Sequence, residues 1–145
     1  MDSASHQALC RKIALGAHSL LQYVSDSAPY VTGESAGVLK KVLALAQEER
    51  DAITRVVRWL QRNHLPAAKL GGFPSHFTTL NFVTLGYLLP KLVAENATLI
   101  AELELLLGQT NDEEARPFIE SYLDMKRRHL ATLTDLSPST APAAA

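Results

Sequence analysis

Residues 38–60 read VLKKVLALAQEERDAITRVVRWL, and this stretch decides the fold. Its apolar residues recur every three or four positions, which is the spacing of one face of an α-helix. The positions on this face are Val38, Val42, Leu45, Ala46, Ile53, Val56, Val57 and Leu60. The pattern predicts a helix over residues 36–63. No stretch of the sequence alternates polar and apolar residues as a half-buried strand does.

Glu49 lies in the middle of that apolar face, four residues after Leu45 and four before Ile53. An unpaired carboxylate is very costly to bury, so we expect it to be protonated, paired with a cation or bound to a metal. The remaining alternative is that the helix turns this face to solvent.

Three further segments show the same periodicity and are predicted to be helices over residues 5–28, 76–108 and 112–136. Together the four predict an all-α four-helix bundle. The connection at residues 64–75 is long enough, at about 3.3 Å per residue, either to cross the length of the bundle or to fold back. Pro90 cannot donate a hydrogen bond to the carbonyl of Gly86, so we expect a kink in the third helix.

Composition limits the kinds of partner and site. The 145 residues carry 14 Lys and Arg against 15 Asp and Glu, so the net charge of −1 gives no field that would attract nucleic acid. The single cysteine, Cys10, excludes an internal disulfide framework and is expected to be a small core residue. No apolar run reaches 18 residues and no secretory leader is recognisable, which predicts a cytoplasmic protein without a membrane span.

The domain is expected to span residues 1–136. The remaining residues, 137–145, are rich in Ser, Pro and Ala and lack any apolar pattern, so we expect a disordered tail.

Polar residues also fall on the inner faces of the third and fourth helices. Asn96 lies within the apolar stripe of the third helix and Glu95 on its flank, while Lys126 and His129 lie one turn apart on the fourth. Glu95 is 15 residues before position 110 and Lys126 is 16 after it, so antiparallel neighbours bring the two to the same height. We therefore predict a polar layer in the middle of the bundle, formed by Glu49, Glu95, Asn96, Lys126 and His129.

Two members of this layer have a simpler interpretation. The aliphatic stem of Lys126 is long enough to carry its ammonium to the edge of the bundle. His129 is equally compatible with a core or rim histidine that binds nothing.

The chain from about residue 6 to 136 resembles the ferritin-like superfamily. The resemblance is carried by residues 77–93, FTTLNFVTLGYLLPKLV, and by residues 127–133, RRHLATL, in the fourth helix. It implies a bundle with a long crossover between the second and third helices. In active members it also implies a di-iron site with one Glu from each of two helices and Glu-x-x-His from each of the other two.

This sequence departs from that motif in both paired positions. The tetrad on the fourth helix begins with Lys126 where the carboxylate belongs, and the tetrad that begins at Glu49 ends with Ala52 where the histidine belongs. The first helix offers no inward Glu. Only Glu49, Glu95 and His129 remain as possible ligands for iron or manganese. We expect instead that the Lys126 ammonium, placed between the carboxylates, replaces the metal.

The leading functional hypothesis is therefore a non-catalytic structural or interaction protein that has lost the di-iron site. Trp59, Tyr23 and Tyr87 lie toward the edges of their apolar faces and are candidates for a contact between two copies in a homodimer. One alternative is a metal-binding ferritin-like protein, an iron oxidase or iron handler with a reduced ligand set. A weaker alternative is a small-ligand binder whose polar layer lines a cavity at the Pro90 kink.

Arg55, Arg58 and Arg62 form a basic stripe on the second predicted helix. Such a run is typical of a solvated helix face, and cations near a helix C-terminus are favourable.

Overall fold

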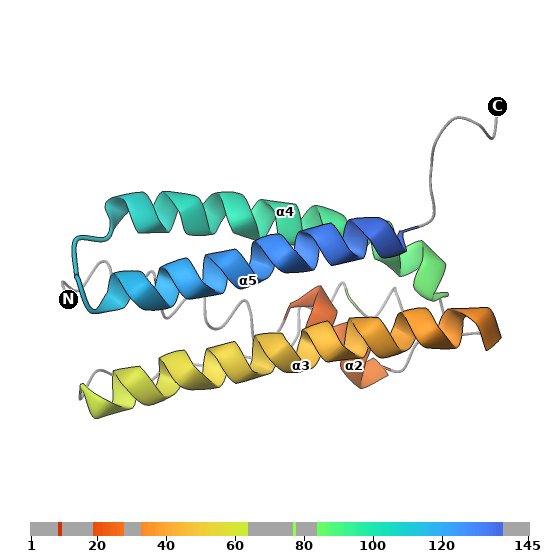
Figure 1. The fold of residues 1–145 in the computed structure, drawn as a ribbon, viewed down its shortest axis with the longest axis horizontal. Coiled ribbons are helices and arrows are strands. Elements are labelled where there is room, and N and C mark those ends of the chain that lie inside the picture. The colour runs from red at the N-terminus through yellow and green to blue at the C-terminus, as the bar shows by residue number, and fades with distance from the viewer. Residues whose placement is uncertain (1–8, 10–18, 28–32, 64–76, 78–83, 138–145) are drawn as a thin grey trace.

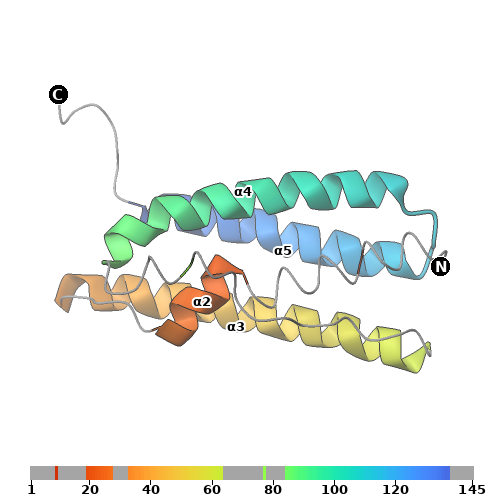
Figure 2. The same ribbon diagram turned by 180° about the vertical axis from the view of Figure 1, so that it is seen from behind.

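The computed structural model describes residues 9, 19–27, 33–63, 77 and 84–137, and within these ranges it is all-α. Its helices are α2 (Leu20–Ser27), α3 (Gly33–Arg62), α4 (Leu85–Gln109) and α5 (Ala115–Leu136). Figures 1 and 2 show α3, α4 and α5 as long rods lying roughly along one axis, with the short α2 beside the first half of α3. The helical bundle expected from the periodicity is confirmed.

Two apolar clusters fill the interior and fix the directions of the helices. One joins the second halves of α3 and α4 to the first half of α5, and its buried members include Leu60 and Leu103. The other joins the first halves of α3 and α4 to the second half of α5, and its buried members include Val42, Leu88 and Leu133. Hence α3 and α4 run in the same direction and α5 runs against both (Figure 1). The connection predicted at residues 64–75 lies outside the described residues.

The continuous helix predicted over residues 5–28 is wrong at Ser19, which is not helical. The α2 helix begins at Leu20, and the Ser19 hydroxyl accepts a hydrogen bond from the backbone N–H of Gln22 at 3.2 Å. A serine in this position satisfies one of the N–H groups that a helix start leaves without an intrahelical partner. Leu9 is helical and buried, whereas Cys10 lies outside the described residues.

The third predicted helix begins later than expected, at Leu85 instead of residue 76. Thr84 is extended, with φ −75° and ψ 156°, and its side chain accepts a hydrogen bond from the N–H of Tyr87, so the helix starts here. Pro90 lies within the first two turns of α4. Both views show these turns inclined toward α3 relative to the rest of the helix, in the region where the kink is expected (Figures 1 and 2).

A short turn joins α4 to α5. The Asp112 carboxylate accepts hydrogen bonds from the N–H groups of Glu114 and Ala115, and this shifts the start of the last helix from the expected residue 112 to Ala115. On the other side of the turn, the Arg116 guanidinium donates to the carbonyls of Leu107 and Thr110. These contacts bind the start of α5 to the end of α4.

The α5 helix ends at Leu136, and its last described neighbour is Ser137. Residues 138–145, most of the expected tail, lie outside the described residues. Among the helices of the described ranges, none has both the length and the apolar character needed to cross a bilayer.

Candidate functional site: the polar interior around Glu49

A buried ion pair joins α3 to α5 between the two apolar clusters. Glu49 on α3 is fully buried and Lys126 on α5 is 1% exposed. The Lys126 ammonium donates to Oε2 of Glu49. The structure thus brings together the two sequence-predicted residues of opposite charge, and Lys126 does not extend to the edge of the bundle.

The second carboxylate oxygen of Glu49 accepts hydrogen bonds from the segment that includes α2. The Ser19 hydroxyl donates to Oε1 at 2.7 Å and the Gln22 side-chain amide donates to the same oxygen at 3.0 Å. The Gln22 amide also donates to the carbonyl of Ala46, and its own oxygen accepts from the Arg50 guanidinium at 2.9 Å. These bonds satisfy the buried charge and tie α2 to α3.

Glu95 also contacts α2, from the side of α4. Its Oε1 accepts a hydrogen bond from the backbone N–H of Leu20 at 2.8 Å. This N–H is the first of the helix, where a negative charge is favourable. Glu49 and Glu95 therefore bind the beginning of α2 from two different helices.

Asn96 and Tyr122 complete the surroundings of Lys126. The Asn96 amide donates to the backbone carbonyl of Lys126 at 2.7 Å, and the ammonium lies 5.7 Å from the centre of the Tyr122 ring. Burial lowers the pKa of Lys126 from 10.5 to about 7, and the nearby carboxylate of Glu48 opposes this shift. Burial thus disfavours the charged form of Lys126, whereas the carboxylates of Glu48 and Glu49 favour it.

His129 is fully buried, and neither of its ring nitrogens has a hydrogen-bond partner among the residues that the structure describes. Its Nε2 lies 3.5 Å from Oε2 of Glu48, a residue that also pairs with Arg128 at 2.8 Å. Burial, together with the positive charge of Lys126, lowers the pKa of His129 from 6.5 to about 4, so the ring is neutral at pH 7. In the structure His129 therefore faces Glu48, which the sequence did not single out.

Sequence reasoning missed Ser19 and Gln22. A continuous first helix places Gln22 outside the apolar face, whereas in the structure its side chain is only 4% exposed. A local signal was present, because Ser19-Leu20-Leu21-Gln22 has the Ser-x-x-Gln spacing of a helix start.

The donor set does not fit the di-iron centre that the resemblance implies. The carboxylate of Glu49 already receives hydrogen bonds from the side chains of Ser19, Gln22 and Lys126. A cation at this position would meet the ammonium at close range. Within the described part of the chain, no three His, Cys, Asp or Glu side chains are grouped so that they could hold a metal ion.

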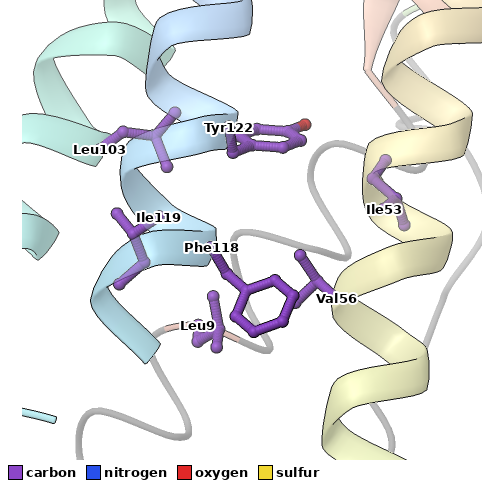
Figure 3. A pocket seen from close by; sticks show the side chains of 7 residues that line it. All are labelled: Leu9, Ile53, Val56, Leu103, Phe118, Ile119 and Tyr122. Atoms are coloured by element: carbon purple, nitrogen blue, oxygen red, sulfur yellow. The ribbon is translucent and has the colours of Figure 1, made fainter. Parts of the chain in front are cut away.

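A small cavity of about 20 Å³ lies between α3 and α5, near Leu9 (Figure 3). Its lining is Leu9, Ile53, Val56, Leu103, Phe118, Ile119 and Tyr122. The Tyr122 hydroxyl, which points toward α3 in Figure 3, is buried and has no hydrogen-bond partner within the described ranges. Burial and the charge of Glu95 raise the pKa of Tyr122 well above its ordinary value. The cavity volume of about 20 Å³ holds about one water molecule.

The position of this cavity differs from the one expected for a ligand site. It belongs to the apolar cluster that includes Leu60 and Leu103, which is remote from the Pro90 turns where a ligand cavity was expected.

The aromatic residues expected at the edges of their helices differ in exposure. Trp59 is only 7% exposed and packs on Phe118 with 5.0 Å between ring centres, so its assignment to a surface contact is wrong. Tyr23 is half-buried and packs against Phe77, while Tyr87 is 55% exposed.

Comparison with known protein families, with curated proteins and with solved structures gave no match to this chain.

Proposed function

We propose that this chain is a non-catalytic structural or interaction protein with a ferritin-like bundle, in which the Glu49–Lys126 pair occupies the place of a di-iron site. Two observations support the ferritin-like part of the proposal. The shared direction of α3 and α4 fits a connection that crosses the length of the bundle. Lys126 faces a carboxylate in the middle of the bundle, where active members bind metal.

The observation that carries an interaction role is the outer face of α4. Tyr87 and Leu105 are 55% and 63% exposed, and they lie eighteen residues apart, about five helical turns, on the same side of the helix. Between these two residues, the same side of α4 carries five further exposed residues, which are Pro90, Lys91, Ala94, Thr98 and Ala101. Only Lys91 in this set is charged. A helix that is apolar on its outer side as well as on its inner side is normally covered by other protein segments on both sides.

This outer face of α4 is suited to a second copy of the chain. Its central residues Ala94, Thr98 and Ala101 are small and let another helix approach closely, while Tyr87 and Leu105 offer large apolar contacts at either end. A twofold contact between two α4 helices would remove this apolar surface from water in both copies at once. The proposed partner is therefore a homodimer mate.

Sedimentation equilibrium tests this surface. We expect the wild-type chain to form dimers, and Ala101→Arg to weaken dimerisation at least tenfold because it places one arginine from each copy inside the apolar contact. Ala44→Arg is the matched control, since Ala44 is exposed on α3 and its replacement should leave dimerisation unchanged. A wild-type chain that stays monomeric at every concentration would disprove the homodimer, as would equal effects of the two substitutions.

Metal content tests the interior. We expect protein purified without chelators to contain no stoichiometric iron or manganese, because the Lys126 ammonium and a metal ion would compete for Glu49. Elemental analysis of wild type and of Glu49→Ala is the measurement. Stoichiometric metal that disappears in Glu49→Ala would instead support the alternative of an iron oxidase or iron handler.

A further inference from the structure

A broad groove of about 590 Å³ lies between the last turns of α3 and the first turns of α5. It is lined by Arg55, Arg58, Gln61 and Arg62 of α3 and by Phe118 of α5. The α3 side chains are exposed and Phe118 is half-buried. None of these residues belongs to the polar interior or to the outer face of α4.

The three guanidinium groups of this groove are unpaired within the described part of the chain. Among the residues placed in the structure, none forms an ion pair or hydrogen bond with the side chains of Arg55, Arg58 or Arg62. The other arginines of the described helices each pair with a carboxylate, and these are Arg50, Arg116, Arg127 and Arg128. The groove therefore concentrates positive charge in a chain whose net charge is −1.

Stabilisation of a helix end does not account for this charge. Favourable interaction of cations with the C-terminal end of a helix is confined to about the last turn. The α3 helix ends at Arg62, so Arg55 and Arg58 lie before that turn. Three cations on one face of successive turns also repel one another, and an anion in the groove would remove this repulsion.

We propose that this groove binds a nucleoside di- or triphosphate. Arg55 and Arg62 are seven residues apart, about 10 Å along the helix, which is farther than a single phosphate group reaches. Guanidinium groups pair with phosphate oxygens through two parallel hydrogen bonds. The Phe118 ring provides an apolar surface for a planar base, and the Gln61 amide can both donate to and accept from the edge of that base.

The chain carries an internal reporter for this site. Trp59 is the single tryptophan, and its ring packs on Phe118, which lines the groove. A base that contacts Phe118 changes the surroundings of the indole without touching it. The fluorescence of Trp59 therefore distinguishes binding in the groove from binding of phosphate elsewhere on the surface.

Calorimetric titration of the full chain with ATP, inorganic diphosphate and adenosine tests the proposal. We expect saturable binding of ATP with a change in Trp59 fluorescence, weaker binding of diphosphate, and no binding of adenosine. The double variant Arg58→Gln/Arg62→Gln should bind ATP at least about tenfold more weakly for each guanidinium removed. Both positions are exposed, and thermal unfolding of the variant verifies that it folds.

Arg127→Gln is the matched control, because Arg127 is exposed on α5 and pairs with Glu104 at 3.1 Å, away from the groove. It should retain wild-type affinity. Failure of ATP to bind at low salt would overturn the proposal, and so would equal affinity in the control and the double variant. Binding of a single-stranded oligonucleotide in preference to ATP would also overturn it. Each outcome is independent of dimerisation and of metal content.

Discussion

Replacement of Lys126 with methionine is expected to lower the free energy of unfolding by about 3–5 kcal/mol at pH 7. The substitution keeps an unbranched side chain that is only one heavy atom shorter, so most of the loss comes from the missing charge and its hydrogen bond to Glu49. Glu49 would then remain fully buried with its hydrogen bonds from Ser19 and Gln22 but without its cation. Denaturant unfolding followed by circular dichroism measures the change. The slope of the unfolding free energy against denaturant concentration should be the same in both proteins, which shows that unfolding exposes the same surface area.

Lys41→Met is the control for this experiment, since Lys41 is exposed on α3 and its loss should change stability little. The double variant Glu49→Leu/Lys126→Met removes both charges and is expected to regain most of the lost stability, because neither partner is left buried alone. An unchanged melting temperature for Lys126→Met at pH 7 would show that the pair does not stabilise the bundle.

Replacement of Glu49 with leucine is expected to cost a similar 3–5 kcal/mol in the free energy of unfolding and, in addition, to weaken the attachment of α2 to α3. The variant leaves the Lys126 ammonium without its carboxylate partner and takes the acceptor from both Ser19 and Gln22. Because α2 has only eight residues, its helix depends on contacts with its neighbours, and this variant removes two of them while the bond from Leu20 to Glu95 remains. Hydrogen exchange of the α2 amides should therefore accelerate strongly in this variant.

The same hydrogen-exchange measurement distinguishes the role of the Glu49–Lys126 ion pair from that of the hydrogen bonds between α2 and Glu49. In Lys126→Met the bonds from α2 to Glu49 are intact, so the α2 amides should exchange at a rate set only by the lower global stability. Asp51→Leu, an exposed carboxylate on α3, is the matched control for Glu49→Leu. If α2 stays as protected in Glu49→Leu as in the control, the carboxylate does not hold this helix.

The inward positions of Glu49 and Lys126 could be predicted because each lies on a long, regular apolar face, whereas the alternative in which the Lys126 ammonium reaches the edge of the bundle was excluded only by the structure. In α3 and α5 the hydrophobic spacing continues for six or more turns, so a residue in the middle of the face has only one direction in which to point. The same regularity placed the ends of these helices within three residues of their positions in the structure. Asn96 lies on the apolar stripe of α4, so its burial could be predicted in the same way.

The contacts of α2 could not be predicted from periodicity. A break at Ser19 changes the rotation of every residue after it, so Gln22 turns inward although an unbroken helix places it outward. The break is favoured by tertiary contacts, since the N–H of Leu20 and the hydroxyl of Ser19 find carboxylates on α4 and α3. Glu48 was missed for a related reason, because its contact with His129 depends on how closely α3 approaches α5.

The separation of Glu49 and Lys126 along the chain affects the order of events during synthesis. The two are 77 residues apart, so at about 5–20 residues per second the ribosome adds the lysine several seconds after the glutamate. Until then an ionised Glu49 is more stable in water than in a closed interior. The amino-terminal half of the bundle thus has a physical reason to stay open until the last helix arrives, and the arrival of that helix supplies the charge that allows it to close.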